Sequence, residues 1–397
     1  WAFFPSGGVA WRISEEEFFG KREWLNSLKL RASYGAVGNS AIDPYQTIAG
    51  LSKYDYLFGE DAGNKFFAYR PSMIPNKDLG WEISRTANFG VDFGLWNNRI
   101  SGYIEGYITK TSDLLMERTL PFFTGFSKVW QNIGKTENKG IELNIQANTL
   151  KTKSFSWETT VTFARNWNKI TELLGGGDIR NNSWFIGKPL QVHYNYEMIG
   201  VWQLGEEKEA QKYGAIPGDI KVKDQNNDGS IGELDKVILG QKDPKIIASL
   251  LNSFRFGAFD ASINLNMNFG SLIHPNTYAS LITRDGLRWM PSNFKYWTPD
   301  NPTNEYTRAD KLSGYDPFAG TGGYMKGDYI KIQDITLGYD FSKIMPKNWK
   351  ILRARLYAQV RNLGYIYKAC KNDVSPEAPD FDYNIPTTYT MGINIDF

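Results

Sequence analysis

Apolar and polar residues alternate at the end of the chain, TTYTMGINIDF. Apolar side chains occupy every second position from Tyr389 to Phe397, and Thr, Gly, Asn and Asp occupy the positions between them. Because successive side chains of a β-strand point to opposite faces of its sheet, this period of two predicts a strand with one apolar and one polar face. An antiparallel strand that is half-buried in a soluble sandwich gives the same pattern, so the rest of the chain has to distinguish the two cases.

The same alternation recurs along the chain and predicts an all-β protein. We expect about eleven antiparallel strands, each near the ~9–11 residues that a tilted strand needs to cross a bilayer. The alternation changes phase within residues 329–341, which predicts a β-bulge near Gln333. The segments with the clearest alternation are 28–35, 87–95, 100–108, 141–148, 155–163, 261–269, 329–341, 353–361 and 387–397.

The expected connections alternate between short and long after the first pair of strands. A soluble sandwich or propeller has connections of mostly ~2–6 residues. Membrane barrels place short turns on the periplasmic side and long loops outside. The pattern therefore favours part of an antiparallel transmembrane β-barrel. The short connections are 97–98, 149–153, 257–258 and 342–350, and the long ones are 39–80, 110–135, 166–244, 271–325 and 363–385.

The polar positions of the expected strands carry many charged and amide side chains. A membrane barrel with a wet lumen turns its polar side chains inward, which is the reverse of a soluble barrel. The alternative is the solvated outer face of a soluble sheet. In the barrel interpretation, Arg353, Arg355 and Arg361 face the interior rather than lipid. The full set of predicted lumen-lining residues is Lys29, Arg31, Asp92, Glu105, Glu142, Asn144, Glu158, Asn264, Asn266, Asn268, Arg353, Arg355 and Arg361.

About eleven strands leave two unpaired sheet edges. Lipid offers no hydrogen-bond partner for an exposed edge, so we expect another chain segment to supply the remaining strands. The sequence begins at Trp1 rather than Met and shows no charged-then-apolar leader. It is therefore expected to be part of a longer protein.

Composition excludes several classes of protein. Aromatic residues make up 15% of the 397 residues, which suits β structure and membrane interfaces. The formal net charge of +2 gives no support for a nucleic-acid partner. A run of ~18 consecutive apolar residues, as a membrane-spanning helix requires, does not occur. The single Cys370 excludes an internal disulfide framework and a Cys-rich metal site.

The segment DQNNDGSIGELD, residues 224–235, fits the template of a calcium-binding loop. Gly229 supplies the sharp turn at position 6, and Ile231 is the apolar anchor at position 8. Asn at position 3 and Asp in place of a bidentate Glu at position 12 argue for weak affinity, so a bound Ca²⁺ would be structural and weakly held. A solvated polar turn is the alternative. The candidate ligands are Asp224, Asn226, Asp228, Ser230 and Asp235.

Other candidate chemistry is sparse, and the sequence does not indicate an enzyme. The signatures Gly-x-Ser-x-Gly and His-Glu-x-x-His do not occur. His193 and His274 are far apart and lie outside metal-ligand spacing. Aromatic residues of the long connections are candidates for stacking on a sugar or peptide, although packing of the loops on one another also explains them. They are Trp184, Tyr194, Tyr196, Trp202, Trp289, Tyr296 and Trp297.

Several of these segments, quoted below, carry a family resemblance. Over nearly its whole length, the chain resembles the C-terminal half of a SusC/RagA-like TonB-dependent outer-membrane transporter. The run KACKNDVSPE departs from the shorter Gly-Tyr-Asp-Pro-Glu-like run of that family. The similar segments, in order, are FFPSGGVAWRISEEEFF, LKLRASYGAVGN, NKDLGWEISRTANFGVDFGLWNNRISGYIEGYITKTSDLL, ENKGIELNI, FIGKPLQVHYNYEMIGVWQ, PGDIKVKDQNNDGSIGELDKVILGQKDPKI, YWTPDNPTN, YIKIQDITLGYDF and RARLYAQVRNL.

The resemblance implies that residues 1–397 are the C-terminal part of a barrel of about 22 strands filled by an N-terminal plug. Residues 166–244 would be a long extracellular loop that contains the Asp-rich segment. The resemblance also implies coupling to TonB, a SusD-like lipoprotein lid over the outer loops, and contact with membrane lipid or lipopolysaccharide. The final Phe397 would be the aromatic signal that the barrel-assembly machinery recognises.

The sequence therefore predicts an energy-coupled outer-membrane importer of oligomeric nutrients, glycans or peptides. Two other classes stay open on the residues alone. One is a secreted, soluble, β-rich carbohydrate-binding protein stabilised by calcium. The other is an outer-membrane enzyme with a barrel anchor, for which the loops would have to hold a catalytic constellation.

Overall fold

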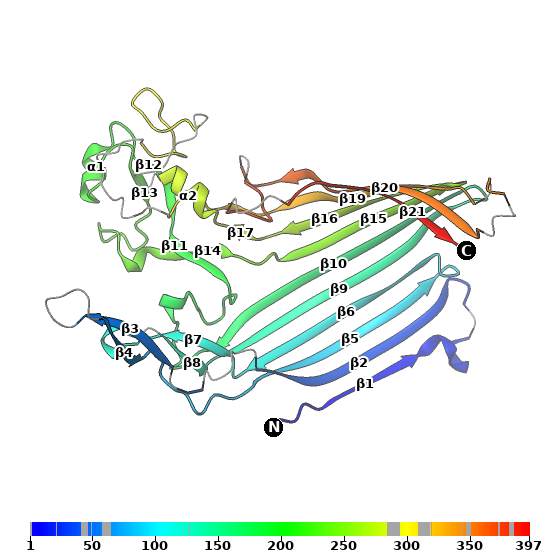
Figure 1. Cartoon of the computed structure of the whole chain (residues 1–397), viewed down its shortest axis with the longest axis horizontal. Helices are drawn as coiled ribbons and strands as arrows, with labels where there is room; N and C mark the ends of the chain where they lie inside the picture. Colours follow the sequence, from blue (N-terminus) through cyan, green and yellow to red (C-terminus); the bar gives the residue numbers. More distant parts are fainter. Residues whose placement is uncertain are drawn as a thin grey trace. The chain divides into compact units, whose positions relative to one another are not determined.

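Eleven strands of the computed structural model form one sheet in which hydrogen-bonded neighbours run antiparallel (Figure 1). The predicted number of strands is confirmed. The structure describes residues 2–20, 22–40, 47–48, 50–57, 65–126, 128–283, 294–308, 318, 320–342, 344–346, 351–371, 374–380 and 385–397. The strands, in their order across the sheet, are β1 (Ser6–Arg12), β2 (Leu25–Asn39), β5 (Glu82–Leu95), β6 (Ile100–Ser112), β9 (Lys135–Lys151), β10 (Phe155–Glu172), β15 (Ile246–Phe256), β16 (Phe259–Phe269), β19 (Tyr329–Asp340), β20 (Arg353–Lys368) and β21 (Thr388–Asp396).

Several strands are longer than the sequence pattern predicted. β9 has 17 residues and β10 has 18, so β10 continues to Glu172, past the expected start of the long connection at 166. The alternation of apolar and polar residues marks only the part of a strand with one apolar face, whereas strand pairing continues where both faces are polar. The predicted bulge at Gln333 is confirmed, because the β19–β20 register shifts between Ile332 and Asp334.

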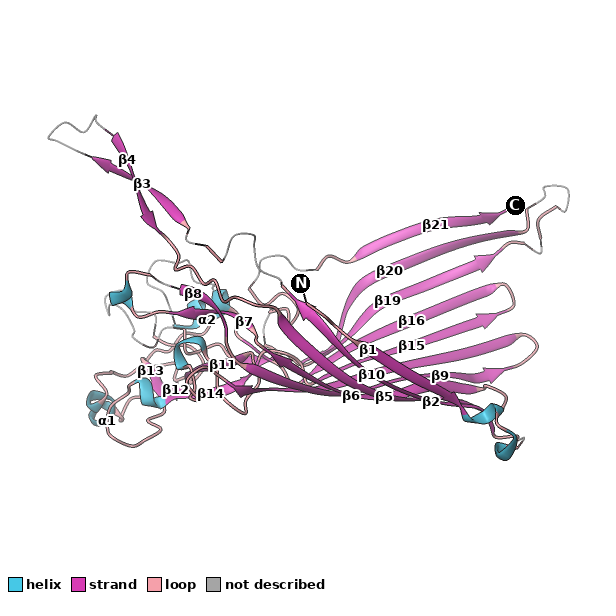
Figure 2. Cartoon of the chain, turned by 90° about the horizontal axis from the view of Figure 1, so that it is seen from below, coloured by secondary structure: helices cyan, strands magenta, loops and turns pink. Residues whose placement is uncertain are grey.

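The chain divides into two compact units, 1–142 with 166–190 and 143–165 with 191–397. The first unit contains the hairpins β3–β4 and β7–β8, and Figure 2 shows β3–β4 extending beyond the ends of β2 and β5. Its further elements are β3 (Leu51–Leu57), β4 (Lys65–Pro71), β7 (Leu115–Thr119), β8 (Lys128–Asn132) and the 3₁₀ turns η1 (Ile13–Glu15), η2 (Glu17–Phe19), η3 (Phe122–Thr124) and η4 (Arg180–Asn182). The second unit adds β11 (Val192–Tyr196), β12 (Met198–Val201), α1 (Glu207–Lys212), β13 (Ile220–Val222), η5 (Glu233–Asp235), β14 (Lys236–Gln241), β17 (Leu272–Ile273), α2 (Asn276–Thr283) and β18 (Met325–Lys326).

The connections alternate between short and long, as the sequence predicted. Asn97 and Asn98 turn the chain between β5 and β6 in the left-handed conformation that Asn tolerates. Gly257 (φ +59°) and Ala258 join β15 to β16. The long connections carry the small hairpins and both α-helices. Neither of these described helices is long and apolar enough to span a bilayer.

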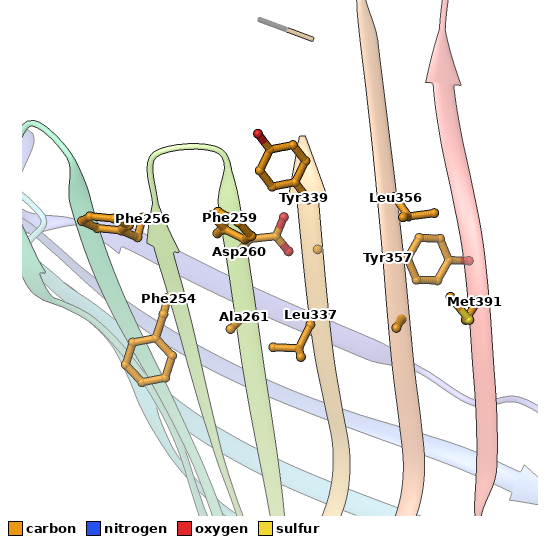
Figure 3. A pocket seen from close by; sticks show the side chains of 12 residues that line it. Phe254, Phe256, Phe259, Asp260, Ala261, Leu337, Tyr339, Leu356, Tyr357 and Met391 are labelled. Carbon is orange, nitrogen blue, oxygen red and sulfur yellow. The ribbon is translucent and has the colours of Figure 1, made fainter. Parts of the chain in front are cut away.

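The apolar face of the sheet is exposed. In the second unit, cross-strand partners form a row from Phe254 through Ala261, Leu337 and Ala358 to Met391. Leu337 is 59% exposed and Met391 76%. Figure 3 shows Phe254, Leu337 and Met391 of this row on neighbouring strands. Together with their neighbours they line an open apolar hollow, whose volume is about 350 Å³. The aliphatic rows therefore do not pack into a dry core among the described residues.

Most of the buried apolar side chains lie instead in the long connections. In the second unit, Tyr278 and Ile282 of α2 pack with Cys370 and Val374, which follow β20. In the first unit, Ile133 and Leu173 are only 3% exposed at the ends of the strands. A single sheet without a covering layer buries little of either face, so most of the described burial occurs where the connections pack on one another.

Candidate functional site

The polar face of the first unit carries a cluster of paired charges. Arg31 Nη2 lies 2.9 Å from Asp92 Oδ1, and Arg31 Nη1 lies 3.1 Å from Glu105 Oε2. Lys29 Nζ lies 3.5 Å from Asp92 Oδ2. Gly90 is the register partner of both Arg31 and Glu105, and a Cβ atom there would lie 2.9 Å from the Arg31 guanidinium. A glycine on the middle strand thus lets charges from the flanking strands meet.

The second unit repeats this arrangement. Arg355 Nε donates a hydrogen bond of 2.8 Å to Asp260 Oδ1, across Gly338 of the intervening strand β19. Arg353 lies 3.5 Å from Asp340. Asp260 and Asp340 were absent from the predicted set, although Asp260 falls on the same alternating positions as Asn264 and Asn266. Extending the alternation to the strand ends would have found it.

The three asparagines of β16 share the polar face. The Asn264 side-chain amide donates to Asp334 Oδ2 at 3.2 Å, and the Asn268 amide donates to the Tyr329 hydroxyl at 2.8 Å. The Oδ1 atoms of Asn264 and Asn268 are buried without a hydrogen-bond partner. Asn266 Oδ1 accepts a hydrogen bond of 3.0 Å from the neighbouring backbone amide of Met267.

The remaining predicted lumen-lining residues have no salt bridge among the described residues. Glu142 and Asn144 lie in β9, and Glu158 lies in β10 opposite Ser253. Arg361 lies in β20 opposite Asp334. The assignment of this face to a barrel lumen stays a prediction.

An acidic residue from the last long connection reaches the polar face, which the sequence did not predict. Glu377 Oε2 lies 2.6 Å from Lys331 Nζ and accepts a hydrogen bond of 2.7 Å from the Tyr365 hydroxyl. The Tyr329 hydroxyl donates to Glu377 Oε1 at 3.4 Å. The Lys331 side chain is 4% exposed, so its ammonium depends on these oxygen atoms for compensation.

The Asp-rich loop is closed by its own hydrogen bonds. Asp224 accepts the backbone amides of Asn227 (2.7 Å) and Gly229 (2.9 Å). Asp235, 1% exposed, accepts the backbone amides of Gln225 (2.8 Å) and Gly232 (2.7 Å). The loop is therefore held by hydrogen bonds of its own residues.

The remaining candidate ligands of this loop also bond to one another. Ser230 donates to Asp228 through its backbone amide and its hydroxyl, and the Asn226 side chain donates to Asp228 as well. These hydrogen bonds lower the pKa of the Asp228 carboxyl. Across the described ranges, no three His, Cys, Asp or Glu side chains gather as a metal cluster. Binding of Ca²⁺ stays a prediction.

Two of the predicted stacking residues are covered by protein. Trp202 is 4% exposed and stacks on Tyr213, with ring centroids 6.0 Å apart. Trp297 is 7% exposed, and its indole N–H donates to Gln203 Oε1 at 2.9 Å. A sugar or peptide cannot reach these ring faces in this structure, so loop packing accounts for both residues.

The other aromatic candidates differ in exposure. Tyr296 is also buried, and Trp184, Tyr194 and Tyr196 are half-buried. Tyr196 packs edge-on against Phe318, with centroids 5.4 Å apart. Trp289 lies outside the described residues. Stacking on a ligand stays a prediction for the partly exposed rings.

The two histidines of the chain, distant in sequence, meet in the structure. The rings of His193 and His274 lie 6.3 Å apart, and the Tyr324 ring stacks on His274 at 4.2 Å. His193 Nε2 donates to the carbonyl oxygen of Leu272 at 2.9 Å, and burial lowers the pKa of its imidazole. No sequence signal linked these residues, because the connections that carry them meet only on folding.

An antiparallel sheet with an exposed apolar face, paired charges on its other face, and alternating short and long connections has the features of a transmembrane β-barrel wall. Residues 1–363 match the family model described as "TonB dependent receptor-like, beta-barrel", and the chain belongs to this family. Proteins of this family lie in the outer membrane, which places this chain there.

Similar proteins carry the same description. "TonB-dependent receptor P26" of Formosa agariphila is 29% identical over 100% of this chain and 42% of its own length. "TonB-dependent receptor SusC" of Bacteroides thetaiotaomicron is 29% identical over 100% of this chain and 40% of its own length. The chain thus spans about two fifths of the length of these relatives, both of which are named TonB-dependent receptors.

Solved structures share the fold. The "Structure of the RagAB peptide transporter" matches with a TM-score of 0.79 and 24% identity, over 100% of this chain and 44% of that one. The RagAB peptide importer in its "closed-closed" state gives a TM-score of 0.80 at 23% identity. At this identity the likeness establishes the fold alone.

Proposed function

We propose that this chain forms barrel wall and outer loops of a TonB-dependent importer that carries oligomeric nutrients, glycans or peptides, across the outer membrane. The polarity of its sheet is the observation that carries the proposal. Apolar rows such as Phe89, Ile104 and Leu337 are exposed, and ion pairs such as Arg31–Asp92 and Arg355–Asp260 lie on the opposite face. Lipid, including lipopolysaccharide, would cover the apolar rows, and the paired charges would border the wet transport path.

The importer needs components outside this chain. Strands β1 and β21 each have one strand neighbour in the described sheet, and lipid cannot satisfy a free edge. The proposal therefore includes further strands and a plug from the rest of the protein. It also includes TonB as the energy-coupling partner and a SusD-like lipoprotein as a lid on the long connections. The family membership and the SusC relative support these partners.

Two finer assignments belong to the same proposal. The Asp224–Asp235 loop would bind Ca²⁺ weakly, as a brace for the long connection that contains it. Phe397 would be the aromatic signal read by the barrel-assembly machinery. Its side chain is 82% exposed and free to be recognised in the unassembled protein.

Uptake by cells tests the importer. A strain lacking the whole gene is complemented with the complete gene, and uptake of a fluorescent oligopeptide mixture and of maltooligosaccharides is measured. We expect uptake of one of the two mixtures to require both the gene and an intact TonB system. Uptake that persists after TonB deletion would contradict the proposal. Extraction of the protein without detergent as a monodisperse monomer would favour a soluble binding protein instead.

A further inference from the structure

A cavity of about 610 Å³ lies among the long connections of the second unit. This volume is within the range of about 300–1,000 Å³ that small-molecule sites occupy. Apolar side chains from four separate elements line it, namely Ile199 of β12, Leu272 of β17, Ile282 of α2 and Met325 of β18. Connections that are distant in sequence thus build one pocket.

The rim of this cavity offers one uncompensated positive charge. Glu305 is paired with Lys371 at 3.2 Å, and Glu197 is paired with Lys223 at 3.4 Å. Lys326, also on the rim, is exposed and has no ion-pair partner among the described residues. An anionic group of a ligand would therefore find its complement at Lys326.

The apolar wall is aliphatic rather than aromatic. Ile199 is 50% exposed, whereas the ring of Tyr278 is 2% exposed. The ring of Tyr324 stacks on His274. A sugar ring binds best to a flat, open aromatic face, which these lining rings do not offer. A wall of branched aliphatic and thioether side chains suits an apolar amino-acid side chain. Removal of that side chain's apolar surface from water would stabilise the bound state.

We propose that this cavity binds an apolar side chain of an oligopeptide, and that Lys326 binds a carboxylate of the same peptide. This inference rests on the proposed importer function and assigns oligopeptides as its substrate class. The charged rim keeps the peptide backbone at the surface, and the aliphatic wall selects for apolar residues.

Two variants and a control test the site in the complete receptor. Ile199→Trp places a larger side chain in the cavity, and Ile199 is 50% exposed and lies outside the buried cluster of Tyr278, Ile282, Cys370 and Val374. Lys326→Gln removes the charge. Lys212→Gln is the matched control, since Lys212 is an exposed lysine of the same unit outside the cavity. The detergent-solubilised receptors are incubated with a tryptic digest of casein and, separately, with maltohexaose. Retained ligands are measured by mass spectrometry.

We expect Ile199→Trp to lower peptide retention at least about tenfold and the control to leave it unchanged. A retained peptide is then synthesised with free and with amidated carboxylates. Lys326→Gln should weaken binding of the free form about fivefold and that of the amidated form not at all. Retention of maltohexaose by the wild type, or peptide binding that neither variant lowers, would overturn the inference. TonB-dependent uptake by the same variants distinguishes failure of this inference from failure of the importer proposal. If only the inference fails, the wild-type receptor still takes up its substrate in a TonB-dependent way. If the importer proposal fails, the wild-type receptor shows no TonB-dependent uptake.

Discussion

Lys331 Nζ and Glu377 Oε2 lie 2.6 Å apart and join strand β19 to the connection that follows β20. The segment around Glu377 is held at two further points. Val374 is completely buried in the cluster with α2, and Asp380 accepts the backbone amide of Asn276 at the start of α2. One short segment therefore links the sheet to the α2 connection, and the ion pair is its anchor on the sheet.

Removing one partner of this pair should release the segment. Lys331→Met leaves Glu377 in a partly buried site without its counter-charge, which costs about 3 kcal/mol for a buried pair. We expect amide hydrogen exchange in 374–380 and in α2 to accelerate by roughly 100-fold. Lys371→Met, which breaks the exposed pair with Glu305, should have little effect. Equal acceleration in the two variants would contradict the anchoring role.

Gly90 should be intolerant of larger side chains. In Gly90→Val the new Cβ would meet the Arg31 guanidinium at 2.9 Å and displace it from Asp92 and Glu105. Overpacking of this kind costs about 1–3 kcal/mol. We expect the folded barrel to lose its resistance to heat and SDS, as seen in its electrophoretic mobility. Gly106→Val is the control, because its nearest neighbour is 3.8 Å away. A Gly90 variant as resistant as this control would refute the prediction.

The Asp224–Asp235 loop should keep its fold without calcium and bind the ion only near millimolar concentration, as low-charge extracellular loops do. Terbium luminescence, sensitised by Tyr213 whose hydroxyl lies 3.3 Å from Asp224 Oδ2, reports occupancy by competition with calcium. Asp224→Ala should abolish the signal. Asp235→Ala should open the loop to proteases even in calcium, because two partly buried backbone amides lose their acceptor. If chelation of calcium alone removed the protease resistance of the wild-type loop, the prediction that the loop is stable without calcium would be wrong.

Acid should destabilise the connections around His193. Burial lowers the pKa of its imidazole below the ordinary value of about 6.5, and Lys242 and His274 oppose a further positive charge. As pH falls through 6.5 the unfolded segment binds a proton before the folded one, so stability present above that pH is lost. We expect hydrogen exchange in β11 and β17, corrected for its intrinsic pH dependence, to accelerate below pH 6. In His193→Gln this pH dependence should shrink, and an unchanged dependence would exclude His193 as its source.

Local patterns were sufficient to predict the sheet. Alternation in segments such as 261–269 predicted a strand with two unlike faces, and the change of phase within 329–341 predicted the bulge at Gln333. Strand ends were less accurate, as β10 shows. The side-chain period of a strand is fixed by its own backbone, so a local pattern reveals it. The length of a strand depends on the neighbour with which it pairs, and a local pattern does not reveal that neighbour.

The candidate site was predicted only in part. Arg31 and Arg355 were assigned to the polar face, but Asp260, the acid that compensates Arg355, was not. The stacking candidates were chosen by residue type, and burial of Trp202 and Trp297 depends on connections about 95 residues apart. Residue type alone does not reveal which aromatic rings a fold will cover.

The sequence by itself determined the polarity of each strand, the number of strands and the alternation of short and long connections, because these follow from the period-2 geometry of an extended chain. Only the tertiary structure decided that Glu377 reaches Lys331, that His193 meets His274, and that four connection elements enclose one cavity. Such contacts depend on how long connections close on one another, and no local period encodes that closure.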